Sequence, residues 1–164
     1  MKLMRIGVSA ALLTMAAPLM AHDPAQQTAS AGALADSARA AAAVVDAFHS
    51  ALKRGDTRAA SALLAGNALI YESGGVERTK AEYEAHHLPA DAEFSRAVSS
   101  TTTRRAGNAS VGLAWIATEG RTTGTYKGKA LDLVTTETML LSRTKSGWKI
   151  VHIHWSSAAN REGK

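Results

Sequence analysis

Residues 36–55 carry hydrophobic positions at the spacing of a helix. Val45, Phe48 and Leu52 are three and four positions apart, so they fall on one helix face and can pack against a core. Gly55 closes this stretch and favours the left-handed backbone that commonly ends helices. The pattern therefore predicts one amphipathic helix over this range.

Three shorter elements are predicted next. Residues 56–66 suit a short helix, because the aspartate at the first position is a good N-cap and the glycine at the last position stops helices. Residues 68–73 are predicted to form a strand. Thr79 and Glu82 make a capping-box pattern that opens a third helix, and this helix is expected to end before Pro89.

From Phe94 onward the pattern changes to that of strands. The connections contain Gly, Asn, Thr and Ser, which are typical of turns. Helices followed by long antiparallel strands indicate an α+β domain whose helices pack on one face of a curved sheet. The four predicted strands span residues 94–104, 110–118, 130–142 and 148–156.

The N-terminal residues have the features of a secretory leader. Lys2 and Arg5 precede an apolar run over residues 6–20, and small residues follow near Ala21. A retained anchor helix is the alternative, but this run is shorter than the roughly 20 residues that a membrane span needs. We therefore expect cleavage after Ala21 and export of the protein, with the periplasm as its compartment.

The rest of the chain divides by composition. Residues 22–35 are small and polar without periodicity, which predicts a flexible lead-in. Residues 36–158 form the predicted domain and residues 159–164 a tail. No later segment is apolar enough to enter a membrane, so no membrane insertion is expected once residues 1–21 are removed.

Charge and cysteine content narrow the kinds of partner. The formal net charge is +5, and the basic residues are scattered rather than interleaved with aromatic ones, so no nucleic-acid partner is expected. The chain has no cysteine. An exported protein of this kind must therefore be stable without disulfides, and a metal site would use His, Asp and Glu.

Two local pairs of histidines are candidates for chemistry. His152 and His154 lie two residues apart in a predicted strand, so they point to the same face. His86 and His87 end the third predicted helix, where neighbours are about 100° apart and cannot aim at one point. Tyr83 precedes this second pair by three and four residues and so flanks both of its members.

Two further polar residues interrupt apolar segments. His49 adjoins the apolar face of the first helix, where we expect a partly buried and hydrogen-bonded residue. Glu137 lies inside the run "VTTETMLLS", where it must face solvent or pair with a cation such as imidazolium, because burying it alone is costly. A histidine close to Glu137 or Asp132 would favour an acid/base role.

The last predicted strand is apolar on both faces. Ile153 and Trp155 are assigned to one face together with Val151, while Ile150 shares the opposite face with the histidines. Two semi-apolar faces are both expected to be covered, one by helices and one by a second copy of the chain. The pattern therefore predicts a homodimer.

The order of the elements resembles the NTF2-like superfamily. The resemblance rests on a helix ending "ALKRGD", a short helix, the segment "ALIYESGGVERTKAEYEAHH" and strands closing with "GWKIVHIHWSS". It covers roughly residues 36–158. Within the superfamily the chain is most similar to SnoaL-like or DUF4440-type exported bacterial proteins. The pattern of His152, His154 and Ser156 is also similar to the association domain of calcium/calmodulin-dependent kinases.

This resemblance implies a fold but leaves the activity open. It implies a cone of helices and strongly curved, mostly antiparallel sheet that encloses a pocket, with dimers formed through the outer sheet face. The superfamily includes isomerases, dehydratases, cyclases and non-catalytic binding or assembly modules. Its cyclases and steroid isomerases use a pocket carboxylate as base, and Asp91, Asp132 and Glu137 remain open candidates for that role.

The resemblance also places the third helix and the last strand beside the pocket. We expect histidines to line a pocket that binds a small organic ligand without a cofactor. One alternative is an isomerase, cyclase or dehydratase that uses a histidine with Asp or Glu as acid and base. Another is a zinc or copper site formed by His86, His87, His152 and His154. The predicted pocket residues are Tyr71, Tyr83, His86, His87, Asp91, His152 and His154.

Overall fold

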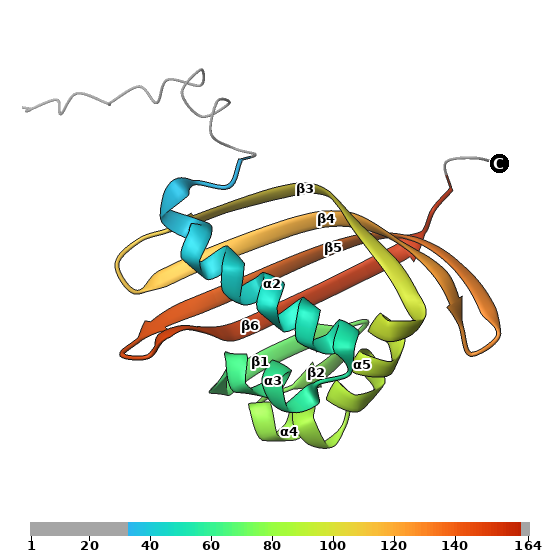
Figure 1. Ribbon diagram of the computed structural model, residues 1–164, viewed down its shortest axis with the longest axis horizontal. Coiled ribbons are helices and arrows are strands. Elements are labelled where there is room, and N and C mark those ends of the chain that lie inside the picture. Colours follow the sequence, from blue (N-terminus) through green and yellow to red (C-terminus); the bar gives the residue numbers. More distant parts are fainter. Residues whose placement is uncertain (1–32, 162–164) are drawn as a thin grey trace, which may run out of the picture.

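The computed structural model describes residues 33–161. The predicted leader, most of the lead-in and the end of the tail lie outside these described residues. Figure 1 shows a layer of helices packed against one face of a curved sheet, which confirms the α+β class. The elements are η1 (Asp36–Ala38), α2 (Arg39–Arg54), α3 (Thr57–Leu63), β1 (Leu64–Glu72), β2 (Gly75–Glu77), α4 (Lys80–Ala85), α5 (Leu88–Ala97), β3 (Val98–Ala109), β4 (Leu113–Tyr126), β5 (Lys129–Thr144) and β6 (Gly147–Ala159).

The long helix α2 supplies the helical side of the core. Val45, Phe48 and Leu52 are all buried, as their spacing predicts. Gly55 ends the helix with a φ of 74°, a conformation that glycine adopts without the steric cost of a Cβ atom. The prediction for this helix is confirmed. No helix within residues 33–161 is long and apolar enough to cross a membrane.

The short helix α3 begins as its N-cap predicts but ends early. The side chain of Asp56 accepts a hydrogen bond of 2.9 Å from the amide of Ala59. The helix then ends at Leu63, and Gly66 lies within β1, so the prediction of a glycine stop is wrong. The reason is that Leu64 already pairs with Ile150 of β6, and pairing in the sheet takes over the chain before the glycine is reached.

The third predicted helix, α4, ends before Pro89 as expected, and a further helix that was not predicted, α5, follows it. The side chain of Thr79 accepts a hydrogen bond of 3.1 Å from the amide of Glu82, which confirms the cap of α4. Helix α5 then extends through Phe94, where a strand was predicted to begin. Pro89 explains the break, because proline cannot continue α4 but is well suited to the first turn of a new helix.

The six strands form one mixed sheet in the order β2-β1-β6-β5-β4-β3. Strands β1 and β6 are parallel, and the other neighbouring strands are antiparallel. Figure 1 shows α2 running across one face of this sheet, here called the inner face. Ile116, Met139 and Ile153 are fully buried beneath the helices, and they form the sheet side of the core.

A β-bulge in β6 changes which residues share a face. Leu140 pairs with His152 and Leu141 pairs with Ile150, so Val151 is an extra residue on β6. Ile150 is therefore buried with Ile153 on the inner face, and the predicted alternation along this strand is wrong on that point. His152 and His154 point away from the helices, to the outer face.

Candidate functional site

A cavity of about 700 Å³ lies between the inner face of the sheet and the helices α2 and α5. Its volume is within the range of pockets that enclose a small organic molecule. The sheet contributes side chains from β3, β4, β5 and β6, together with the end of β1. On the inner face of the sheet, the cavity lies next to the buried apolar side chains of the core.

One row of cross-strand neighbours forms the polar floor of this cavity. Paired residues in adjacent strands point to the same face, and the register places five cavity residues side by side. We call this set the charged row. In order across β3, β4, β5, β6 and β1, its members are Arg105, Thr118, Glu137, Trp155 and Glu72.

Glu137 is the buried carboxylate of this row, with only 9% of its side chain exposed. Its Oε2 accepts a hydrogen bond of 2.7 Å from Nε1 of Trp155 and lies 2.8 Å from Nε2 of His49. Burial alone would raise the pKa of Glu137, but His49, Trp155 and the Arg105 charge together hold that pKa below its usual value. The buried carboxylate is therefore ionised at neutral pH.

His49 reaches this carboxylate from α2. Its imidazole lines the cavity and is 44% exposed. Phe48, the preceding residue, packs its ring 6.3 Å from Trp155 and fixes the helix above the charged row. Only Nε2 of His49 has a hydrogen-bond partner among residues 33–161. Nδ1 is thus available to a ligand.

Helix α2 also contacts Arg105, another member of the charged row. Asp46, three residues before His49, lies 2.6 Å from Arg105 through its Oδ1 atom. Arg105 Nε, Thr118 Oγ1 and Glu137 Oε1 are buried without a hydrogen-bond partner in the described part of the chain. Unpaired buried polar groups are uncommon in native proteins, and here three of them occupy adjacent positions of the charged row.

A second pair of carboxyl groups lines another part of the cavity. Asp91 accepts a hydrogen bond of 2.7 Å from the hydroxyl of the buried Tyr83. Burial raises the pKa of Asp91 although Tyr83 and His87 oppose this effect. Burial also raises the pKa of Glu72, and the neighbouring Asp91 charge adds to the effect. These two groups therefore hold protons more readily than ordinary carboxylates.

Of the seven predicted pocket residues, Asp91 lines this cavity, whereas Tyr83 is buried in the hydrophobic core. His86 and His87 lie elsewhere, against the buried carboxylate of Glu77. Nδ1 of His87 is hydrogen-bonded to Oε1 of Glu77, and Nδ1 of His86 lies 3.6 Å from the same atom. The prediction that these two histidines cannot reach one point is wrong, because α4 ends before them and the backbone turns.

Tyr71, His152 and His154 form a separate cluster on the outer face. The ring of Tyr71 lies 5.3 Å from that of His152 and 6.2 Å from that of His154. His154 and Tyr71 border a shallow hollow beside the β1–β2 turn. The structure thus places the two strand histidines outside the cavity, on the side of β6 opposite to Trp155.

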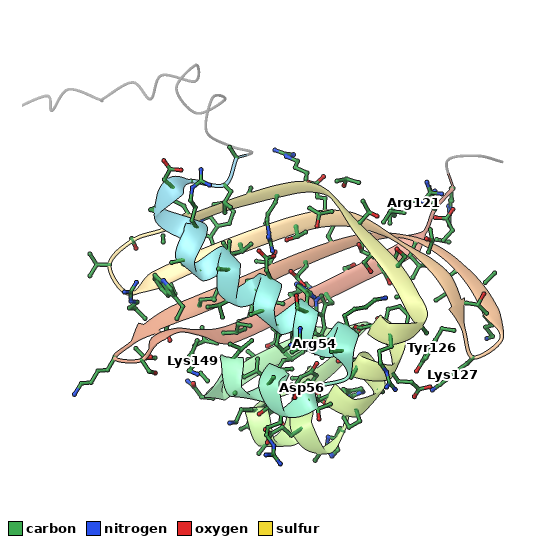
Figure 2. All side chains as sticks on the ribbon, in the orientation of Figure 1. Arg54, Asp56, Arg121, Tyr126, Lys127 and Lys149 are labelled. Carbon is green, nitrogen blue, oxygen red and sulfur yellow. The ribbon has the colours of Figure 1, made fainter. Side chains whose placement is uncertain are left out.

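The remaining carboxylate candidate lies away from the cavity. Asp132 forms an ion pair with Arg121, with 2.6 Å between Oδ2 and Nη2. This contact holds the pKa of Asp132 below its usual value. Figure 2 shows Arg121 at the end of the sheet away from α2. Of the three candidates for the pocket base, Glu137 and Asp91 line the cavity.

The sequence pointed to Glu137 but not to the histidine that binds it. His49 was expected only to be a partly buried, hydrogen-bonded residue, which is its environment here. No group of three or more His, Asp or Glu side chains within residues 33–161 is arranged to hold a metal ion. Zinc or copper binding stays a prediction for metal analysis to test.

Three solved structures show the same fold. A provisionally assigned ketosteroid isomerase from Shewanella frigidimarina is 37% identical over 76% of this chain and 100% of that one, with a TM-score of 0.71. A provisionally assigned calcium/calmodulin-dependent protein kinase II association domain from Xanthomonas campestris is 23% identical over 79% of this chain and 94% of that one, with a TM-score of 0.62. A provisionally assigned dehydratase of the NTF2-like family from Streptomyces avermitilis is 18% identical over 74% and 96%, with a TM-score of 0.61.

The comparison with family models identifies the domain. Among curated proteins none matches this chain. The model of the SnoaL-like domain matches residues 41–160, which is most of the described chain. Solved structures of NTF2-like proteins superpose on this chain with TM-scores of 0.61 and 0.63. The protein therefore belongs to the SnoaL-like domain family and has the NTF2-like fold.

Proposed function

We propose that this protein binds a small organic molecule in its cavity and catalyses a proton transfer on it. His49 is the acid and base of this reaction, and Glu137 is the residue that positions it. The observation that carries the proposal is the 2.8 Å contact between Nε2 of His49 and the buried carboxylate of Glu137. A carboxylate beside a cavity histidine is the arrangement that favours catalysis over binding alone.

The contact fixes which nitrogen of the imidazole does the chemistry. Because Nε2 donates its proton to the ionised Glu137, Nδ1 is the atom that faces a ligand as a base. It can take a proton from a carbon next to a carbonyl group, which leaves an enolate on the substrate. Return of a proton from the imidazolium to a second carbon moves the double bond and leaves the overall composition unchanged, and this proton can exchange with solvent before it is returned. The carboxylate stabilises the imidazolium that forms between these steps.

Other features of the site support this reaction. The relative from Shewanella frigidimarina is named as an isomerase, and we propose an isomerase-type proton transfer for this chain as well. Three buried polar atoms of the charged row lack partners, a local cost that proteins tend to accept at functional sites. The pKa values of Asp91 and Glu72 are raised, so these two cavity groups take up a proton more readily than ordinary carboxylates.

Hydrogen exchange at carbon tests the proposal. A β,γ-unsaturated ketosteroid is incubated with the protein in deuterated buffer, and loss of the α-proton is followed by NMR. We expect the His49→Gln variant to lose about 10²- to 10⁴-fold in exchange rate. His152→Gln serves as the matched control. Its exchange rate should stay within about twofold of the parent, because His152 lies on the outer face, away from the cavity. Equal rates in the parent and in His49→Gln would contradict the proposal.

We propose also that the protein forms a homodimer through the outer sheet face. Large apolar side chains are exposed on this face, among them Leu113, Trp115 and Val134, and contiguous apolar patches commonly mark interfaces. Trp115→Glu should convert the dimer to a monomer in light scattering. Lys145→Glu in the exposed β5–β6 turn should not. A monomeric parent protein would contradict this proposal.

Export to the periplasm remains a proposal that rests on the N-terminal sequence. A basic start, an apolar run and a small residue near the expected cleavage point support it. Sequencing of the protein from a periplasmic extract should find His22 at the N-terminus. Intact Met1 in membrane fractions would instead indicate the retained anchor helix.

A further inference from the structure

A second row on the inner face, next to the charged row, is made of hydroxyl groups. Thr102 pairs with Gly120, Gly120 with Thr135, and Thr135 with Ser157. All four residues line the cavity. We call Thr102, Thr135 and Ser157 the hydroxyl row. It lies two residues from the charged row along β4, β5 and β6, and three residues from it along β3, where the bulge adds a residue.

The hydroxyl row differs from its neighbours because its side chains are not bonded to one another. Further along the same strands, Ser100 and Thr122 are hydrogen-bonded to each other at 2.9 Å. The hydroxyls of Thr102, Thr135 and Ser157 have no partner among residues 33–161. They are free to donate to and accept from a ligand.

Gly120 keeps the middle of this row open. A Cβ atom at this position would lie 2.8 Å from the carbonyl oxygen of Thr101 and 3.1 Å from Oγ1 of Thr135. The nearer of these atoms belongs to the backbone, so a side chain does not fit at this position without a shift of β3. The hydroxyls on either side are thus left facing a gap rather than a neighbouring side chain.

The spacing of the two rows sets the geometry of a bound molecule. Two residues along a strand correspond to roughly 7 Å, and neighbouring strands are about 4.8 Å apart. A ligand whose reacting carbon lies at His49 therefore meets the hydroxyl row roughly 7 Å away. Two or three hydroxyl groups lie there within the width of a fused ring system.

We propose that the cavity selects oxygen-rich ligands, namely polyhydroxylated ring compounds, over hydrocarbon skeletons of the same size. The inference rests on the proposed function for the location of the reacting carbon, but the selection itself is a property of binding. Ligand hydroxyl groups bond to Thr102, Thr135 and Ser157 while the reacting end lies against His49. Beneath a hydrocarbon skeleton of the same size, these three unpaired hydroxyl groups would be left unsatisfied.

The test uses two pairs of probes that share a skeleton and differ in hydroxyl groups: progesterone with cortisol, and 1-tetralone with 5,8-dihydroxy-1-tetralone. Dissociation constants are measured by amide shifts in NMR titrations of the mature protein. In at least one pair the hydroxylated member should bind on the order of tenfold more tightly. A triple variant (Thr102→Val, Thr135→Val, Ser157→Ala) should reduce that preference to below about threefold.

Thr123→Val is the matched control, because this threonine lies on the same sheet but points to the outer face. It should leave the preference unchanged. Ser157→Ala alone, at an exposed position, should reduce the preference by about threefold and serves if the triple variant does not fold. Equal affinity within both pairs, no binding of any probe, or a preference that survives the triple variant would overturn the inference.

The two proposals fail in different experiments. Affinity is measured without turnover, whereas the proposed proton transfer is measured by deuterium exchange in His49→Gln. A hydroxyl preference that is lost in the triple variant supports this inference even if His49→Gln exchanges normally. Exchange that depends on His49, with no preference between the probes, supports the catalytic proposal and overturns this one.

Discussion

Two carboxylate–histidine pairs in this protein have nearly the same local geometry. Glu137 faces His49, and Glu77 faces His87 with His86 beside it. Both carboxylates are buried, with 9% and 6% of their side chains exposed. The imidazoles of His49 and His87 are about half exposed in both cases. Contact between the two side chains does not by itself distinguish a candidate site.

The surroundings of the two histidines differ, although both contacts favour the charged forms of the paired groups. His49 lines the cavity, whereas His87 does not. At the first pair, His49 and its neighbours lower the pKa of Glu137. At the second, the hydrogen bond to Glu77 raises the pKa of His87. A pair can do chemistry only where the open side of the imidazole meets a space that holds a ligand.

Neutralising each carboxylate in turn gives the largest expected difference. Glu137→Gln should lower the deuterium exchange rate by about 10- to 100-fold, because the imidazolium loses its counter-charge. The Michaelis constant should stay within about threefold, because the proposal assigns Glu137 to positioning His49 rather than to binding the ligand. Glu77→Gln is the matched change at the second pair and should leave the rate within about twofold.

Equal losses of exchange rate in Glu137→Gln and Glu77→Gln would show that the pair in the cavity is not special for catalysis. Such a result would assign the effect to stability rather than to the cavity. Circular dichroism of both variants checks that they fold. A loss in Glu137→Gln that appears entirely in the Michaelis constant would also contradict the positioning role, because it would indicate lost binding.

The pair of Glu137 and His49 should also make the stability of the protein depend on pH. The folded-state pKa of Glu137 is below its ordinary value of 4.5. Its contribution to stability is therefore fully present above that value and is lost as the pH falls through the folded-state pKa. Glu137→Gln should cost about 1–3 kcal/mol in the free energy of unfolding at pH 7, and this deficit should shrink as the pH falls below 4.5.

Urea unfolding at a series of pH values measures this deficit. Glu119→Gln provides the control, because Glu119 is an exposed carboxylate 3.3 Å from Arg104. Exposed ion pairs contribute little, so its deficit should be below about 1 kcal/mol. If the Glu137→Gln deficit is the same at every pH, the loss is one of packing and not of charge.

The fold could be predicted where its signals are local. Asp56 and Thr79 were identified as caps from their own neighbourhoods, and Gly55 as a left-handed helix end. Phe94 was misassigned because Pro89 signals an end to one helix and, equally, a start to the next. The bulge at Val151 has no sequence signal, since it exists only in the pairing of β6 with β5.

The candidate site was harder to predict because its members are distant in the chain. His49 and Glu137 are joined only by the packing of α2 on the sheet, which no local pattern encodes. The sequence did show that Glu137 would need a cation if buried. Histidines close in sequence were the more visible candidates, but His152 and His154 share a face that turns away from the cavity.

The pair of Glu77 and His87 should show the smallest effect on stability, and this effect should change as the pH rises above 6.5. The folded-state pKa of His87 is above its ordinary value of 6.5 because of the hydrogen bond to Glu77. Its contribution to stability is therefore present below pH 6.5 and is lost as the pH rises through the folded-state pKa. His87→Gln should be less stable than the parent at pH 6 and should approach it at higher pH.

A double-mutant cycle assigns this effect to the pair. In the Glu77→Gln background the partner of His87 is neutral, so His87→Gln should no longer change the pH dependence of unfolding. Persistence of the effect in that background would assign it to other charges near His87, such as Asp91 and Glu72. The two pairs would then still differ in their access to the cavity. The raised pKa of His87, however, would result from the whole acidic cluster and not from Glu77 alone.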